Sequence, residues 1–150
     1  ISYIIGFTGY DLRLKCVEVV TKLSNFEPST IVNPTAFVAP SAKLGKGCYV
    51  GANASISSNA VLEDHVIVNL NASIGHDSII RKHSIILPGA RVSGDVEIGE
   101  GCLMGSNAFI FKGLKIGDFN QIDALTYIHE NLPPNMISSS RNTKTFKRVI

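Results

Sequence analysis

Apolar residues recur at every sixth position over a long central part of the chain. Counting in steps of six from Val38 to Ile128, every stop is apolar and no insertion interrupts the count. A period of six matches neither the roughly 3.6-residue repeat of a helix nor the two-residue alternation of a flat strand. It is typical of the hexapeptide repeat of a parallel β-helix. The positions of this apolar ladder are Val38, Leu44, Val50, Ile56, Leu62, Val68, Ile74, Ile80, Ile86, Val92, Ile98, Met104, Ile110, Ile116, Ile122 and Ile128.

Small residues accompany the ladder in a fixed phase. The residue two places before a ladder position is usually Ala, Ser or Cys, and the residue just after it is often Gly. We expect the small residues to lie inside the corners and the glycines to supply unusual backbone angles there. Three hexapeptides make one triangular coil, so residues 18 apart stack on one face. The region should form about five coils, each burying its face against the next.

The chain on either side of residues 33–130 follows other patterns. Residues 1–7 predict a buried strand, residues 8–11 a turn, and apolar residues at helical spacing up to Leu23 predict a helix with Asp11 near its N-terminus. A short strand is expected at 29–32. Residues 1–32 therefore resemble a partial Rossmann-like α/β element, either part of a nucleotide-binding unit or a packing element, because no G-x-G-x-x-G is present. Prolines 133 and 134 end the last coil and leave 131–150 as a C-terminal tail.

Composition excludes several classes of protein. The net charge is +2 with no concentrated basic face, so we expect no nucleic-acid partner. No apolar run approaches the ~18 residues of a membrane span, and no signal peptide is expected. Cys48 and Cys102 lie three coils apart, ~14 Å at ~4.8 Å per coil, which is too far for a disulfide, and their inward positions do not suit a nucleophile. These features predict a reduced, cytoplasmic protein. The first residue is Ile1 rather than Met, which suggests a trimmed N-terminus.

His76 is the leading candidate for chemistry. It follows Ile74 by two places, so its side chain should point outward at a corner. Its stack neighbours are Ser58 and Gly94, and Gly94 leaves room and a backbone amide near the imidazole. Asp77 follows directly, and an acidic neighbour can orient an imidazole and raise its basicity. The alternative is an exposed polar corner without a function.

The other three histidines have weaker claims. His65 and His83 are 18 apart and should stack one coil apart. They form either a metal pair or two solvated corner histidines, and we favour the second because no third ligand completes a site. His129 lies where the pattern frays and is expected to be structural or solvated.

Two runs around His76 carry a more specific pattern. Residues 68–78 read VNLNASIGHDS and residues 87–99 read LPGARVSGDVEIG. Together they resemble the sialic acid O-acetyltransferase and bacterial sugar N-acetyltransferase family. Its members have a small Rossmann-like subdomain followed by a left-handed β-helix. They form trimers and transfer acetyl from acetyl-CoA to a sugar in surface glycan biosynthesis. The resemblance covers nearly the whole chain.

The resemblance implies roles for four residues. His76 would act as general base on a sugar hydroxyl or amine that attacks the thioester directly, and Asp77 would hold the imidazole. The amide of Gly94 would meet the developing oxyanion. Asn69 matches a family Asn near the acceptor. The acceptor would be sialic acid or a nucleotide-linked amino sugar, and the sequence does not choose between O- and N-acetylation.

The resemblance also places the CoA arm along the β-helix, between neighbouring subunits. Ile85, Ser106 and Ala124 match its path, with Gly94 at the reacting end. Ser106 and Ala124 are 18 apart and form a corner line separate from the His76 line. A homotrimer would bring one subunit's His76 line against its neighbour's Ser106 line.

Three departures from the family fall on this donor side. Ile85 replaces a second family His, residues 123–126 read DALT in place of Gly-Ala-Gly-Ala, and residues 140–144 read SRNTK in place of Gly-x-Pro-Ala-Lys. These departures leave two other classes open. One is a β-helix protein with lost or altered donor binding and a structural or binding role. The other is a metal-dependent hydrolyase of gamma-carbonic-anhydrase type, although its His-x-x-x-x-His pair is absent and we expect no metal.

Overall fold

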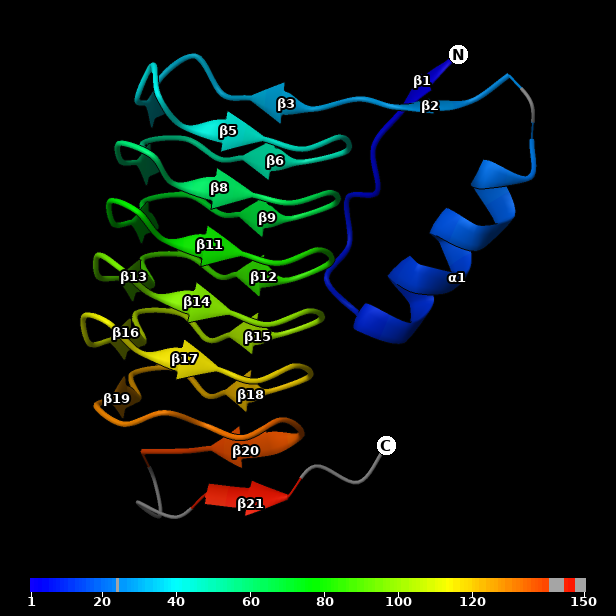
Figure 1. Ribbon diagram of the computed structural model, residues 1–150. Coiled ribbons are helices and arrows are strands. Elements are labelled where there is room, and N and C mark those ends of the chain that lie inside the picture. The colour runs from blue at the N-terminus through cyan, green and yellow to red at the C-terminus, as the bar shows by residue number, and fades with distance from the viewer. Residues whose placement is uncertain (24, 141–144, 148–150) are drawn as a thin grey trace.

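A computed structural model describes residues 1–23, 25–140 and 145–147. Short strands follow one another every six residues along the apolar ladder, and turns separate them (Figure 1). Each ladder residue is the second residue of its strand. The strands are β3 (Ile31–Val32), β4 (Phe37–Val38), β5 (Lys43–Leu44), β6 (Tyr49–Val50), β7 (Ser55–Ile56), β8 (Val61–Leu62), β9 (Ile67–Val68), β10 (Ser73–Ile74), β11 (Ile79–Ile80), β12 (Ile85–Ile86), β13 (Arg91–Val92), β14 (Glu97–Ile98), β15 (Leu103–Met104), β16 (Phe109–Ile110), β17 (Lys115–Ile116), β18 (Gln121–Ile122) and β19 (Tyr127–Ile128).

These strands form three parallel sheets around a triangular prism. A six-stranded sheet runs from β4 to β19, a five-stranded sheet from β5 to β17, and an eight-stranded sheet starts at β3 and takes in β20 (Met136–Ser138). The last strand of that sheet, β21 (Thr145–Lys147), pairs antiparallel with β20. Partners along the coils are 18 residues apart, as in the pair Ile74 and Val92. The fold is the left-handed β-helix that was expected. It has close to six coils, one more than the ladder indicated, because β3 pairs in parallel with β6.

The ladder forms the core of the prism. Its residues from Val50 to Ile128 are at most 5% exposed, whereas Val38 and Leu44 are only partly buried in the first coils. Burying each such aliphatic side chain contributes roughly 1.5–3 kcal/mol. Asn120 is a larger polar residue among the mostly small inner positions. Its amide donates to the carbonyls of Gly117 and Pro133 and accepts from the Met136 amide, so this buried polar group is fully paired and holds the crossing into β20.

The glycines after the ladder positions do not have the role that we expected. None of them has a positive φ. A side chain at Gly75 would instead collide with the backbone of Ser93 and Gly94, and one at Gly51 would lie 2.7 Å from the Leu70 amide nitrogen. Close approach of the next coil therefore requires these glycines. The left-handed backbone occurs two residues later, for example at Asn71 (φ 56°) and Asp77 (φ 58°), where Asn, Asp and Gly are best tolerated.

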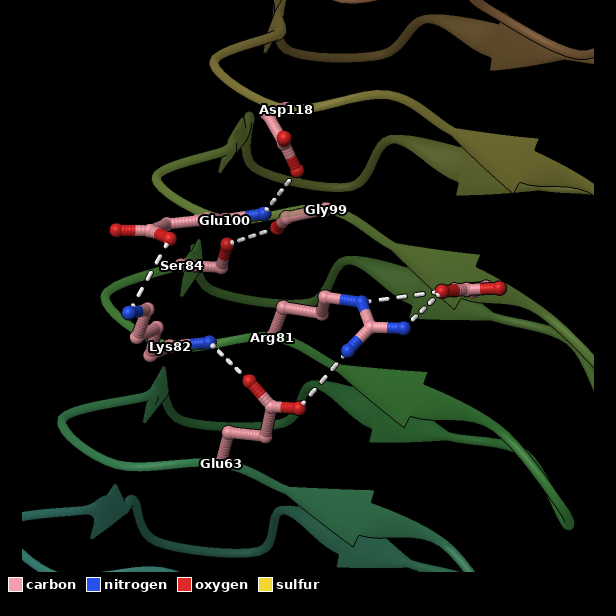
Figure 2. A network of polar contacts seen from close by, with 8 residues as sticks. Glu63, Arg81, Lys82, Ser84, Gly99, Glu100 and Asp118 are labelled. Atoms are coloured by element: carbon pink, nitrogen blue, oxygen red, sulfur yellow. Dashed lines mark hydrogen bonds and ion pairs between the residues drawn. The ribbon is translucent and has the colours of Figure 1, made fainter.

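Charged side chains link successive coils along the five-stranded sheet (Figure 2). The Arg81 guanidinium donates to Glu63 at 3.1 Å and to Glu97 at 3.0 Å, one coil to either side. Glu63 also accepts from the Lys82 amide, and Lys82 pairs with Glu100. These groups are a third or more exposed in most cases, so each pair adds at most about 1 kcal/mol. The network fixes the stacking of coils beside the turn that carries Lys82.

The N-terminal segment stands beside the stack (Figure 1). It contains β1 (Ser2–Tyr3), which pairs with β2 (Glu27–Pro28), and the helix α1 (Tyr10–Thr21). The predicted helix is confirmed. The predicted buried strand at 1–7 is wrong, because the strand is two residues long and only Ile5 in that segment is buried. The division of the chain into 1–32, 33–130 and 131–150 stays a prediction. No helix in the described part of the chain is long and apolar enough to cross a membrane.

Candidate active site

His76 and Asp77 lie in the turn between β10 and β11, where the six-stranded and five-stranded sheets meet. We call this edge the His76 corner. Both side chains are about half exposed, and Asp77 Oδ2 is 2.8 Å from His76 Nδ1. Asn59, one coil away, donates to Asp77 Oδ1 at 3.0 Å. The bond from Asn59 and then the contact with His76 lower the pKa of Asp77. An ionised Asp77 favours a proton on Nδ1, which leaves the lone pair of the neutral imidazole on Nε2.

Gly94 lies one coil beyond His76, and its missing side chain leaves space that the imidazole uses. A Cβ at this position would collide with Nε2 and would lie 2.6 Å from Cε1. The room expected beside His76 is therefore present. Among the described residues, no acceptor takes a hydrogen bond from the Gly94 amide. The exposed His76 imidazole and the amide of Gly94, which is itself buried, thus lie on neighbouring turns of this corner.

Sequence reasoning missed two charged residues at this corner, Asp95 and Lys112. Lys112 Nζ lies 3.1 Å from Asp95 Oδ2. One ligand-type atom from each of His76, Asp77 and Asp95 lies within 4.8 Å of the others, a set that could chelate a cation. The 18-residue repeat held the signal, since Asp95 is 18 residues after Asp77 and Lys112 is 18 after Gly94.

Three other predicted residues lie at a different edge, where the eight-stranded and six-stranded sheets meet. We call this edge the Ser106 corner. Ser106 is half-buried and Ala124 is exposed, and the Leu125 amide donates to the Ser106 carbonyl at 3.0 Å, so the two turns stack as expected. Asn69 is half-buried in the same line of turns, with its side-chain oxygen on the Leu70 amide. Within one subunit the structure does not bring these residues to His76.

Ile85 lies apart from both corners. It is 1% exposed on the eight-stranded sheet. The turn into α1 lies over this part of the sheet and borders an open pocket of about 380 Å³, to which Ile85, Tyr10 and Gln121 contribute. Of the three departures from the family, Ile85 and residues 123–126 are placed by the structure, whereas residues 141–144 lie outside the described residues. Within 123–126, Leu125 is 72% exposed in the turn after β18.

Comparison with known proteins decides the family. The family described as bacterial transferase hexapeptide (six repeats) matches residues 77–112. The solved acetyltransferase domain of PglB from Neisseria gonorrhoeae is 30% identical, with a TM-score of 0.89 over 94% of this chain and 68% of that chain. The chain belongs to the hexapeptide-repeat sugar acetyltransferases.

Two more distant solved structures share the fold. Perosamine N-acetyltransferase from Caulobacter crescentus is 24% identical, with a TM-score of 0.91 over 96% of this chain and 68% of that chain. WeeI from Acinetobacter baumannii is 17% identical, with a TM-score of 0.89 over 96% and 70%. No curated protein matches the chain.

The acetyltransferase also carries a pair of histidines in a very different setting from that of His76. His65 and His83 stack with ring centroids 5.3 Å apart and planes 4° apart, which confirms the predicted stack. The expectation that they are solvated is wrong, because each is 7% exposed. The N-terminal segment covers them: Tyr3 stacks on His65, and Tyr10 meets His83 edge-on. We call the edge between the five-stranded and eight-stranded sheets, where they lie, the stacked-histidine corner.

Arg13 locks the N-terminal segment onto this corner. It is 1% exposed, and its guanidinium donates to the carbonyls of Ile5 and Phe7 and, at 2.7 Å, to that of His65. Burial, followed by the charge of the partner His and Arg13, lowers the pKa of His65, and burial followed by Arg13 lowers that of His83. Among the described residues these histidines join no group of three metal-ligating side chains.

The cysteines and His129 lie away from the His76 corner or inside the prism. Cys16, Cys48 and Cys102 are all free. Burial raises the pKa of Cys48 to about 11 and that of Cys102 to about 12, so neither offers a thiolate near neutral pH. His129 is exposed and stacks on Tyr127 at 5.5 Å.

Proposed function

We propose that this acetyltransferase moves the acetyl group of acetyl-CoA to a hydroxyl or amine of a sugar or nucleotide-linked sugar, with His76 as general base. The observation that carries this proposal is the His76–Asp77 pair, in which Asp77 engages Nδ1 and leaves Nε2 beside Gly94. The PglB acetyltransferase domain, 29% identical in its complex with acetyl coenzyme A, supports acetyl-CoA as the donor. The setting would be surface glycan biosynthesis in the cytoplasm.

The proposed transfer is a single displacement at the thioester carbonyl. The acceptor oxygen or nitrogen forms a bond to the carbonyl carbon while its proton passes to Nε2 of His76. The tetrahedral oxyanion takes a hydrogen bond from the Gly94 amide, and the C–S bond then breaks as the proton moves on to the CoA thiolate. A positioned base contributes roughly 10²–10⁴-fold to such a step, and one oxyanion donor contributes a similar factor. Asp77 stabilises the imidazolium without being protonated.

The donor side of the proposal requires a second subunit. In one subunit the His76 corner and the Ser106 corner are different edges of the prism, separated by the six-stranded sheet. Ser106 and Ala124 present small side chains at a stacked edge, a surface that suits an extended pantetheine arm. A homotrimer would place this edge of one subunit against His76 of the next. Light scattering should therefore report a trimer, and a fully active monomer would refute this arrangement.

The direct test is an acetyl-CoA consumption assay across amino sugars, nucleotide-linked sugars and sialic acid. We expect thiol release that depends on one acceptor class and falls at least 100-fold in His76→Ala. His129→Ala, an exposed histidine at the last coil, serves as the matched control and should keep wild-type activity. Absence of CoA binding by calorimetry, together with His76→Ala activity equal to wild type, would instead favour a β-helix protein with a structural or binding role.

A further inference from the structure

We propose that Asp95, aimed by Lys112, positions the acceptor at His76 and makes the site suited to an amine nucleophile. This inference rests on the proposed function and deepens it, since neither residue takes part in the mechanism derived above. The evidence is the geometry of four stacked turns at the His76 corner. It also bears on the choice between N- and O-acetylation.

Asp77 and Asp95 occupy equivalent positions in successive turns of this corner. They are 18 residues apart and have nearly equal left-handed backbone angles, φ 58° and 59°. The Asp95 amide donates to the His76 carbonyl at 2.9 Å, which fixes the two turns against one another. A carboxylate oxygen of Asp95 lies within 4.8 Å of both a His76 ring nitrogen and an Asp77 oxygen. Two carboxylates therefore flank one imidazole.

The two carboxylates differ in how many oxygens are already engaged. Asp77 has both occupied, one by His76 and the other by Asn59. Asp95 has Oδ2 paired with Lys112 at 3.1 Å, and no described residue donates to its Oδ1. Its side chain is 45% exposed. Asp95 is thus the carboxylate at this corner with an oxygen available to a ligand.

The position of this free oxygen suits the acceptor better than the donor. Because position 94 has no side chain, the imidazole lies against the turn that carries Asp95. An acceptor atom within reach of Nε2 therefore comes close to Asp95 as well. The Lys112 ammonium pairs with Oδ2 of this carboxylate and fixes the direction in which it points. Asp95 then accepts a hydrogen bond from the acceptor and takes no proton itself.

An amine uses this arrangement more fully than a hydroxyl does. As the nitrogen bonds to the carbonyl carbon, one of its protons passes to Nε2 of His76 and then to the departing CoA thiolate. A second N–H stays on nitrogen throughout and can donate to Asp95 Oδ1. A hydroxyl has a single proton, which His76 takes. The Asp95 carboxylate beside the general base His76 can therefore bind the N–H that an amine keeps, which favours N-acetylation of an amino sugar.

The test compares Asp95→Gly with Asn53→Gly in the full chain. Both residues occupy the left-handed position of their turns (φ 59° and 55°). Glycine takes this position in both lines of turns, at Gly113 in the line of Asp95 and at Gly89 in the line of Asn53, so neither change strains the backbone. For the best amine acceptor of the sugar panel, we expect Asp95→Gly to lower kcat/KM roughly 10- to 100-fold, the size of one hydrogen bond to a charged group. Acceptor KM should rise while acetyl-CoA KM stays within about twofold of wild type.

Further variants separate positioning from structure. Lys112→Met should raise acceptor KM by a few-fold, and Asp95→Asn, which keeps an acceptor oxygen, should recover part of the loss. The loss should be larger for the amine acceptor than for its hydroxyl counterpart. Wild-type kinetics in Asp95→Gly, or equal losses for donor and acceptor, would overturn this inference while leaving the proposed function intact. An inactive wild-type protein would instead defeat the proposed function.

Discussion

Histidines occupy two of the three corners of the prism, and the two corners place the imidazole in opposite surroundings. His76 is half exposed, bound to a carboxylate on one nitrogen and open on the other. His65 and His83 are 7% exposed, stacked on one another and covered by aromatic rings. The coils beneath are built alike. What differs is the layer outside, since the N-terminal segment lies over one corner and not over the other.

This contrast separates two uses of one residue type. A corner histidine that remains open and has a carboxylate neighbour can take and return a proton. One that is covered and faces a guanidinium is kept neutral and serves as packing surface. The hexapeptide repeat alone determines that a corner imidazole points away from the core. Whether that imidazole is exposed to solvent depends on whether the N-terminal segment covers the corner.

The largest effects should come from exchanging each kind of histidine for Asn. His76→Asn should lower kcat by roughly 10²–10⁴-fold, because it removes the proposed base, and leave thermal unfolding unchanged. His83→Asn keeps a residue that tolerates φ 63°, so it should retain activity per folded molecule and lose stability. Acetyl-CoA assays and calorimetric melting on both variants check this. If His76→Asn and His83→Asn change kcat and the melting temperature in the same way, the two corners do not differ in function as described.

Arg13 provides the next largest effect. Arg13→Met keeps the length of the side chain but leaves the carbonyls of Ile5, Phe7 and His65 without their buried donor. We expect a loss of roughly 2–4 kcal/mol in the free energy of unfolding, measured with urea. Lys15→Met, an exposed cation on the same helix, is the control and should change stability by less than about 0.5 kcal/mol. Equal stability of the two variants would show that Arg13 does not lock the segment.

The β-helix could be predicted from the sequence, whereas the packing of the N-terminal segment over one of its corners could not. A fixed period of six made the stacking of His65 on His83, and of Gly94 on His76, predictable from position alone. Burial of the stacked pair was not predictable, because it depends on Arg13, one of four charged residues in a helix whose apolar Leu12 and Val19 are exposed. Its partners are carbonyls up to 52 residues away, which no local pattern encodes.

The roles of small and charged residues illustrate the same limit. Glycines after the ladder were predictable as corner residues, yet their cause is the approach of the next coil rather than a positive φ. The stacking of residues 18 apart could have placed Asp95 next to Asp77. It was missed because a charged residue at an exposed turn has no distinguishing signal until its distance to His76 is known.

The stacked pair should also make stability depend on pH. Since the folded pKa values of His65 and His83 lie below the ordinary value of 6.5, the unfolded chain binds more protons as the pH falls. The contribution of the two neutral histidines to the free energy of unfolding should be fully present above pH 6.5. Below pH 6.5 the free energy of unfolding should decrease, by at most about 1.4 kcal/mol per pH unit for each histidine. Arg13 and Lys82 oppose protonation here, and Asp64 favours it. Urea unfolding between pH 7.5 and 5 measures the slope.

The double variant His65→Asn, His83→Asn is the control for that slope. It should flatten the pH dependence, whereas His76→Asn should leave it as in wild type. If the free energy of unfolding of the double variant depends on pH as steeply as that of wild type, groups other than His65 and His83 cause the acid sensitivity. Burial of these two histidines under the N-terminal segment would then not explain it.

The smallest effect should come from the inner layer, where the two corners are alike. At the His76 corner Ser78 Oγ donates to the Ser93 carbonyl at 2.9 Å, and at the stacked-histidine corner Ser84 Oγ donates to that of Gly99 (Figure 2). Cys102 Sγ makes the corresponding bond to Gly117 at 3.1 Å, one coil beyond Ser84. Cys102→Ser should therefore keep the bond and change the free energy of unfolding by less than about 1 kcal/mol. Its acetyl-transfer rate should equal that of wild type, because a thiol with a pKa near 12 carries no acyl group at neutral pH. A large loss of acetyl-transfer rate in Cys102→Ser with unchanged stability would indicate that Cys102, in addition to or in place of His76, takes part in the reaction.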